Sequence, residues 1–154
     1  YDTKIIIEEM VNGRELECAV LGNENPLASP IGEVIMNTSS FYSYDAKYIE
    51  TDGAITEIPA KNLSKTDIKK LQETALKTYQ VLGAEGLSRV DMFLTKKGEV
   101  YVNEINTLPG FTDISMYPKL FELKGISKAD LIDKLILLAI ERFERDNKLQ
   151  TSVS

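Results

Sequence analysis

The chain has 154 residues, of which 43% are hydrophobic and 27% charged, as in an ordinary globular protein of about one domain. Its formal net charge of −6 and the lack of a basic stripe argue against nucleic-acid binding, and the absence of histidine excludes a Ser-His-Asp triad, a histidine general base and a histidine-ligated zinc site. No apolar run approaches about 18 residues and no basic-then-apolar leader is present, so we expect neither a membrane span nor a signal peptide.

The N-terminal part of the chain predicts a β-hairpin. Residues 3–11 form an apolar run that we expect to be a buried strand. Asn12-Gly13 is a strong signal for a hairpin turn, and residues 14–21 are the expected return strand. Because the chain begins at Tyr1 rather than Met and enters a strand at once, we expect it to be a piece of a longer protein.

Acidic and apolar residues alternate along 14–21, so the two faces of this strand differ. The single cysteine, Cys18, lies among the apolar residues and has no partner for an internal disulfide, so we expect it in the core. The acidic side chains of the hairpin either face solvent or bind a ligand: Glu8, Glu9, Glu15 and Glu17.

The next region predicts short strands and loops. Residues 23–30 are expected to be a loop, 31–36 a short strand, and 54–58 a brief strand that ends at Pro59. Between them, residues 37–50 contain four aromatic side chains and a lysine without clear periodicity. Such a loop is either a mobile lid over a binding site or a surface loop anchored by its tyrosines.

Residues 64–82 predict a helix that packs on the sheet. Ser64 is followed three residues later by Asp67, which resembles a capping box with Asp in place of Glu or Gln. Gly83 follows the last apolar residue and is a typical stop signal. The expected inward-facing stripe consists of Ile68, Leu71, Ala75, Tyr79 and Leu82.

The stretch 89–106 predicts a second hairpin, which contains the candidate site. Residues 89–94 alternate between two faces, as expected of a strand. Lys97-Gly98 offers a two-residue turn, in which glycine tolerates a positive φ. In that turn Lys96 faces Glu99, whereas a three-residue turn would break the register.

The two-residue turn pairs Asp91 with Glu104, and Arg89 with Asn106. Directly opposed side chains have Cβ atoms about 5 Å apart, where two carboxylates repel by roughly 3 kcal/mol at an effective dielectric constant of about 20. A cation between them turns this repulsion into attraction, and Asn106 adds an oxygen on the same face. Such all-oxygen ligands suit Mg²⁺, which also binds water and phosphate oxygens. The alternative is a set of solvent-facing polar side chains on a two-stranded ribbon.

Two further helices are expected to follow a loop at 107–114 that contains Pro and Gly. The first, 115–124, ends at Gly125, and the second, 127–145, begins with a capping sequence and is followed by a polar, frayed tail at 146–154. The inward-facing residues expected on the second helix are Leu131, Leu135, Leu138 and Ala139. Strands combined with helices that pack on one side of them predict the α+β class.

Five motifs stand in a fixed order along the chain. They are E-E-M-V-N-G-R-E-L at 8–16, F-Y-S-Y-D-A-K-Y at 41–48, G-L-S-R-V-D at 86–91, N-E-I-N-T-L-P-G-F-T at 103–112 and S-M-Y-P at 115–118. Together they resemble the C-terminal portion of the D-alanine–D-alanine ligases, ATP-grasp enzymes of bacterial cell-wall synthesis. Many ATP-grasp ligases share N-E-I-N-T and R-V-D, whereas the combination with D-A-K-Y and P-G-F-T is far more specific.

The resemblance implies an α+β fold, the ATP-grasp C-terminal subdomain, with a mainly antiparallel sheet and helices packed on it. This subdomain would span residues 1–145, with a polar tail at 146–154. The N-terminal domain and the first part of the ATP-grasp domain, with its phosphate-contacting lysines and glycine-rich loop, would be absent from this chain. We therefore expect the chain alone to bind nucleotide weakly and to be inactive.

The resemblance also implies roles for the second hairpin and the loop after it. Asp91, Glu104 and Asn106 would hold two Mg²⁺ (or Mn²⁺) ions per site, with Glu104 bridging them, in agreement with the register above. Arg89 would face the transferring phosphoryl group and the developing tetrahedral oxygens. Gly110 would belong to the oxyanion region.

The remaining implied roles concern nucleotide and substrate. Glu8 would accept a hydrogen bond from the adenine amino group, and Glu15 would bind the ribose hydroxyls. The expected backbone contacts to the adenine edge come from Met10 and Val11.

The resemblance assigns two further pairs to the amino-acid site. Lys47 and Tyr48 would form a lid pair, Lys47 toward phosphate and Tyr48 closing over the amino-acid site. Ser115 and Met116 resemble the contacts to the second D-alanine, with Ser115 reaching its carboxylate.

The implied reaction is ATP-dependent ligation of two D-alanines for peptidoglycan precursor synthesis. The carboxylate of one D-alanine attacks the γ-phosphate of ATP to give an acyl phosphate, and the amine of the second D-alanine displaces phosphate. Positioning and charge neutralisation suffice for such chemistry, which agrees with a site of Mg²⁺, Lys and Arg without a covalent nucleophile. The resemblance further implies a cytoplasmic enzyme that is a homodimer at full length.

Three alternatives remain at this point. The chain could belong to another ATP-grasp carboxylate–amine ligase that shares only the metal hairpin. It could be part of a D-alanine–D-serine ligase, because Tyr48 within D-A-K-Y and S-M-Y-P at 115–118 favour D-alanine over D-lactate as second substrate but exclude D-serine less well. It could also be a non-catalytic module that binds nucleotide and Mg²⁺.

Overall fold

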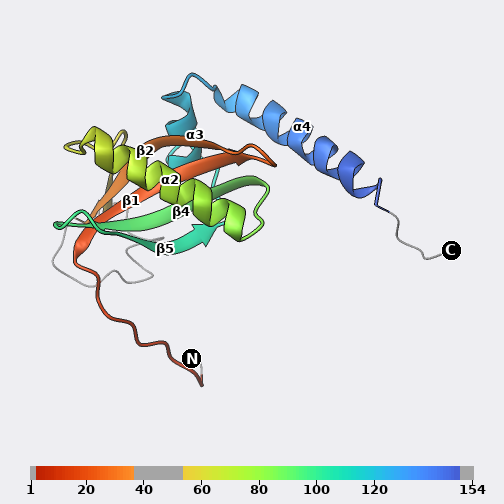
Figure 1. Ribbon diagram of the computed structural model, residues 1–154. Coiled ribbons are helices and arrows are strands. Elements are labelled where there is room, and N and C mark those ends of the chain that lie inside the picture. Colours follow the sequence, from red (N-terminus) through yellow and green to blue (C-terminus); the bar gives the residue numbers. More distant parts are fainter. Residues whose placement is uncertain (1–2, 37–53, 150–154) are drawn as a thin grey trace.

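The computed structural model describes residues 3–36 and 54–149, which form one antiparallel sheet and three helices. The elements in chain order are β1 (Gly13–Gly22), β2 (Leu27–Met36), β3 (Ala54–Glu57), α2 (Lys65–Val81), β4 (Gly86–Thr95), β5 (Val100–Asn106), α3 (Met116–Glu122) and α4 (Lys128–Asp146). The strand order across the sheet is β3-β2-β1-β4-β5, and each strand runs antiparallel to its neighbours. The α+β class and the mainly antiparallel sheet are therefore confirmed (Figure 1).

Helices cover both faces of this sheet, so the expectation that they pack on one side is wrong. On one face, α2 buries Leu71, Ala75 and Tyr79 against apolar side chains of β1, β2 and β4. On the other face, Ala19 and Leu21 form an apolar patch, and α3 and the start of α4 cover it. The two cores are separate because successive residues of a strand point to opposite faces.

Local signals predicted the helices well. In α2 the Ser64 hydroxyl accepts a hydrogen bond from the Asp67 backbone N–H at 3.0 Å, and Gly83 has the positive φ of 64° expected after a helix. Leu82, predicted to face inward, is instead 61% exposed, because it is the C-cap and lies beyond the last turn that contacts the sheet.

Helix α4 is also capped as predicted, by Ser127, but only its first turns reach the core. Leu131 is fully buried, whereas Ala139 is exposed and was wrongly predicted to face inward. The reason is visible in Figure 1, in which α4 extends away from α3 toward the C-terminal end. None of the helices in the described part of the chain is both long and apolar enough to cross a membrane.

The predicted N-terminal hairpin does not form. Residues 4–12 are not in a strand, and the isoleucines at 5–7 are more than four-fifths exposed. Gly13 is not a turn residue but the first residue of β1. Because β1 already pairs with β2 on one edge and β4 on the other, it has no free edge for a preceding strand.

Strand β2 begins earlier than predicted. It starts at Leu27, so the predicted loop at 23–30 shrinks to four residues. Pro30 lies inside the strand, where it is tolerated because β3 pairs only with Glu33–Met36 and leaves this part of the edge open. Ser29 compensates for an irregularity in the β1–β2 register, since its hydroxyl accepts from the Ala19 backbone N–H at 2.9 Å.

Candidate active site

The β4–β5 connection differs from the predicted two-residue turn. The Thr95 N–H donates to the Glu99 carbonyl at 2.9 Å, and the Gly98 N–H donates to the Thr95 carbonyl at 3.0 Å. Residues 96–98 therefore form a three-residue loop, in which Gly98 has a φ of 77°. This loop shifts the pairing of the adjacent residues by one, so that Met92 faces Val102.

A β-bulge then restores the predicted register. It lies at Asn103, an extra residue on β5 between Val102 and Glu104. Beyond it Asp91 lies directly opposite Glu104, and the predicted pairing of Arg89 with Asn106 is also found. The turn prediction was wrong, but the predicted pairing of the two carboxylates is confirmed because the bulge offsets the longer loop.

Five polar residues meet on the sheet face opposite α2. The even-numbered residues of β4, among them Val90 and Met92, pack into the core beneath α2, so the odd-numbered residues face the other side. The cross-strand register then places four predicted site residues on this face, together with one that was not predicted to belong to the site. The four are Arg89, Asp91, Glu104 and Asn106, and the fifth is Glu17.

Arg89 is the positive centre of this group. Its Nε and Nη2 donate to the two carboxylate oxygens of Asp91 at 2.7 and 2.6 Å. Glu17 of β1 approaches the same Nε with Oε2 at 3.1 Å. Burial alone lowers the pKa of Arg89, but the bonds to Asp91 and the charges of Glu17, Asp91 and Glu104 outweigh it and raise the pKa. Arg89 is therefore always protonated.

Sequence reasoning gave Glu17 no specific role and left open whether its side chain faces solvent or binds a ligand; of these two alternatives, solvent exposure is wrong. The residue is only 6% exposed and lies directly opposite Asp91 in the β1–β4 register. Phe93 was missed as well, although it shares the site face and pairs with Glu15. The available signal was period-two parity, because Glu15 and Glu17 lie on the same face of one strand.

The metal ligands predicted on β5 are placed less tightly than Asp91. Glu104 is exposed, and the Asn106 side-chain oxygen accepts from the Leu108 N–H at 3.1 Å. Across residues 3–36 and 54–149, no three acidic, cysteine or histidine side chains are close enough to hold a metal ion. A cation would thus have to draw Glu104 toward Asp91, and the second lone pair of the amide oxygen remains available to it.

The loop after β5 brings Gly110 to Ser115. A Cβ atom at Gly110 would lie 2.8 Å from the Ser115 hydroxyl oxygen, so this position has little room for a side chain. That hydroxyl also accepts from the Thr112 N–H at 3.0 Å. The Met116 side chain, at the start of α3, is buried next to Gly32 of β2, so any contact that Met116 makes with a substrate would come from its backbone.

The residues predicted to contact adenine lie in the exposed segment that precedes β1. Met10 and Val11 line a hollow of about 210 Å³ together with Tyr101 of β5. Glu8 is exposed, whereas Glu15 is half-buried on the site face of β1. The predicted lid residues, Lys47 and Tyr48, lie outside the described residues.

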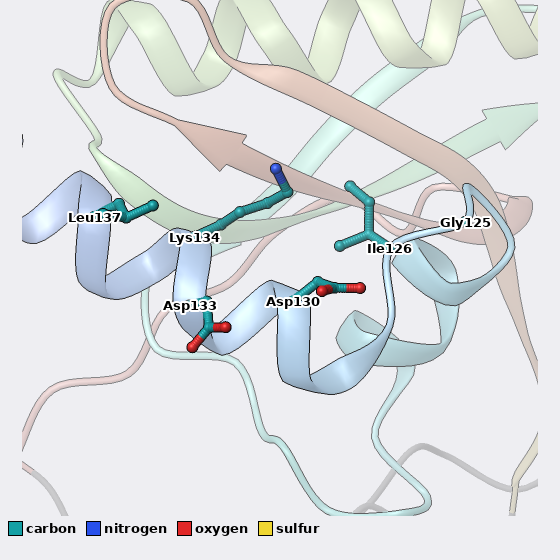
Figure 2. A pocket seen from close by; sticks show the side chains of 6 residues that line it. All are labelled: Gly125, Ile126, Asp130, Asp133, Lys134 and Leu137. Carbon is teal, nitrogen blue, oxygen red and sulfur yellow. The ribbon is translucent and has the colours of Figure 1, made fainter.

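A second hollow, of about 280 Å³, lies between α4 and the turn that precedes it (Figure 2). Asp130 extends toward Ile126, whereas Asp133 and Lys134 point to opposite sides of the helix. The Asp130 carboxylate also accepts from the capping Ser127 hydroxyl at 2.6 Å. Because these charged groups do not converge, the hollow does not form a metal or phosphate site.

Comparisons with known proteins agree with the motifs. The family model "D-ala D-ala ligase C-terminus" matches residues 1–137. The D-alanine–D-alanine ligase of Shouchella clausii is 57% identical over 153 residues, which are 99% of this chain and 41% of that protein.

Solved structures agree as well. The D-alanine–D-alanine ligase from Coxiella burnetii matches with a TM-score of 0.78 and 41% identity, over 92% of this chain and 36% of that one. The VanG D-Ala:D-Ser ligase from Enterococcus faecalis matches with a TM-score of 0.73 and 36% identity, over 84% of this chain and 37% of that one. The chain thus spans about two fifths of the length of the relatives it matches.

Proposed function

The chain belongs to the family of D-alanine–D-alanine ligases, as their C-terminal portion, and on this premise we propose that it supplies half of the catalytic site for ATP-dependent synthesis of D-alanyl-D-alanine. The reaction would join two D-alanines through an acyl phosphate, for peptidoglycan precursors, in a cytoplasmic enzyme. The full-length enzyme is expected to be a homodimer. One observation carries the proposal: Asp91 and Glu104 face each other beside Arg89 on the same face of the sheet.

The charges at this site fit a divalent cation. Three carboxylates, those of Glu17, Asp91 and Glu104, lie around the single guanidinium of Arg89 on this face, so the site is rich in anionic oxygens. All predicted ligands are oxygens, which Mg²⁺ and Mn²⁺ prefer. Asp91, Glu104 and Asn106 would hold the metal, which when bound would neutralise the phosphate oxygens of ATP.

Arg89 would bind the transferring phosphoryl group, since its guanidinium carries a permanent charge on the site face. It would also stabilise the tetrahedral oxygens that develop when the amine of the second D-alanine attacks the acyl phosphate. Ser115 would hydrogen-bond the carboxylate of that D-alanine. Because Gly110 has no side chain, its backbone would be able to approach the reacting carbonyl. Positioning and charge therefore account for the chemistry without a covalent nucleophile.

The nucleotide would lie along the start of β1. Glu15 faces the same side as Asp91 and would bind the ribose hydroxyls, while Glu8 and the backbone of Met10 and Val11 would contact the adenine edge. Lys47 and Tyr48 would close over phosphate and amino acid. Exclusion of water by such a lid protects the acyl phosphate from hydrolysis.

D-Serine is the alternative second substrate, because the chain also matches a D-Ala:D-Ser ligase. The D-alanine assignment is supported by the relatives named D-alanine–D-alanine ligase, among them the Shouchella clausii enzyme at 57% identity. A product assay that supplies both amino acids together decides between them.

A chimeric enzyme tests the proposal. The chain would replace the corresponding C-terminal part of the Shouchella clausii ligase, and formation of ADP and D-alanyl-D-alanine would be measured with Mg²⁺. We expect activity in the chimera and none from the 154-residue chain alone. Asp91→Asn should reduce activity by at least about a hundredfold, since it removes a ligand charge from the site.

Glu33→Gln is the matched control for that variant. Glu33 is a buried carboxylate paired with an arginine, but it lies on a different strand and contacts Arg14 rather than Arg89. The chimera with this change should keep most of its activity at a temperature where it is folded. Ligase activity of the isolated chain, or full activity of the Asp91→Asn chimera, would contradict the proposal.

A further inference from the structure

Arg89 contacts two carboxylates that come from different strands. Asp91, on its own strand, receives hydrogen bonds from Nε and Nη2 at 2.7 and 2.6 Å. Glu17, on β1, places Oε2 at 3.1 Å from the same Nε. The three side chains are 20%, 4% and 8% exposed in the order Arg89, Asp91, Glu17, so water screens these contacts weakly.

The order of the strands decides which of the two carboxylates lies next to Glu104. Asp91 lies between Glu17 on β1 and Glu104 on β5, because it is directly opposite both in the two registers. A cation held between Asp91 and Glu104 would compete for the oxygens of Asp91 and repel the guanidinium of Arg89. Glu17 lies on the side of Asp91 away from Glu104, so it remains available to Arg89.

We propose that Glu17 is a positioning residue for Arg89, a second carboxylate that holds the guanidinium on the site face when Asp91 is engaged elsewhere. The functional part of this inference rests on the proposed ligase activity. The physical part does not, because it concerns only which carboxylate binds Arg89. A small rotation of the guanidinium redirects the Nε–H from Asp91 to Glu17, which is already within 3.1 Å.

The Arg14–Glu33 pair provides a matched internal comparison. Arg14 Nε and Nη2 donate to the two oxygens of Glu33 at 2.7 and 2.6 Å, the same bidentate geometry as in Arg89 and Asp91. As whole residues, Glu33 is 8% exposed and Glu17 6%. Arg14, however, has one bidentate carboxylate partner and two backbone carbonyls, from Lys61 and Asn62, in place of a second carboxylate contact.

Exchange of the arginine Nε–H groups with solvent tests the physical part in the ¹⁵N-labelled chain. The chain has four arginines, so their Nε–H signals are few enough to assign. In Asp91→Ala, Arg89 should stay protected because Glu17 takes over. In the double variant Asp91→Ala with Glu17→Gln, exchange of the Arg89 Nε–H should be at least about tenfold faster than in Asp91→Ala, because one more hydrogen bond to a charged group is lost.

The Arg14 signal reports folding in the wild type and in every variant of Asp91 and Glu17, since its protection depends on the intact β1–β2 pairing. If Asp91→Ala does not fold, Asp91→Asn replaces it at nearly the same volume. Glu33→Gln should speed exchange of Arg14 and leave Arg89 unchanged. Equal exchange of Arg89 in the single and double variants, whether both fast or both slow, would overturn the inference.

The chimeric ligase tests the functional part. Glu17→Gln should lower kcat about tenfold or more and leave KM for ATP unchanged, while Glu33→Gln leaves both unchanged. An unchanged kcat would refute the positioning role. A chimera without any activity would instead count against the proposed function, and the exchange result on Arg89 would stand independently.

Discussion

Arg14 and Arg89 make ion pairs of two kinds. Arg14 binds Glu33 and two backbone carbonyls, so its charge is matched and it ties the loop before α2 to the sheet. Arg89 is surrounded instead by several carboxylates from neighbouring strands, which include Glu17 and Asp91. Such clusters of interacting charged groups are common at functional sites.

Cys18 predicts a loss of stability at alkaline pH. Burial raises the pKa of its thiol from 9.0 to about 12, so the folded protein keeps a proton that the unfolded chain loses above about pH 9. The contribution of this protonated thiol to the free energy of unfolding is fully present below pH 9 and is lost as the pH rises toward 12. Between pH 8 and 10.5 the free energy of unfolding should fall by about 1–2 kcal/mol more in the wild type than in Cys18→Ala.

Urea unfolding at the two pH values measures this difference. Burial also raises the pKa of Tyr79 and Tyr117, so both proteins should lose stability in this range, and only the difference belongs to Cys18. An equal loss in both proteins would refute the prediction.

At the scale of elements, the β4–β5 hairpin shows how a site is built from two irregularities. The three-residue loop at 96–98 moves the strand pairing by one residue, and the bulge at Asn103 moves it back. Without this compensation Glu104 would not face Asp91, because a shift of one residue turns a side chain to the other face.

An exchange of two neighbouring residues tests this arrangement. In the variant Asn103→Glu with Glu104→Asn, composition and net charge are unchanged, but the carboxylate occupies the extra position of the bulge. We expect chimeric ligase activity to fall by at least about a hundredfold, close to the effect of Glu104→Gln, because the ligand no longer faces Asp91. Retained activity would show that the register across the hairpin does not position the site.

At the scale of the whole molecule, the apolar residues are unevenly covered. The described residues form two cores, yet Ile5, Ile6 and Ile7 are 82–87% exposed, and α4 exposes a stripe along its outer side. The chain spans about two fifths of the length of its relatives. The sheet therefore has its own packing on both faces, whereas these exposed apolar side chains lie outside the two cores.

Two truncations of the chain should differ in their effect on stability. Removal of residues 1–11 should change the free energy of unfolding by less than about 0.5 kcal/mol, since the described part of this segment is exposed and pairs with no strand. Removal of residues 127–154 deletes Leu131, which is fully buried against α3, and should cost about 2–5 kcal/mol. Urea unfolding of both proteins measures the contrast, and a large loss from the N-terminal truncation would contradict it.

The sequence alone determined the elements whose signals are local. Helix caps at Ser64 and Ser127 and period-two alternation along β1 and β4 located most of the fold. Motif order indicated the family, and the hairpin register placed Asp91 opposite Glu104. Capping and alternation succeeded as signals because they depend on residues only a few positions apart.

Only the tertiary structure decided the rest. The apolar run at the N-terminus forms no strand because both edges of β1 are occupied by β2 and β4, and α2 and α3 lie on opposite faces because both faces of β1 are apolar in part. The burial of Glu17 follows from its neighbours across the sheet, Arg89 and Asp91. Such features depend on which strands become neighbours, and that is settled by packing between residues distant in sequence rather than by local pattern.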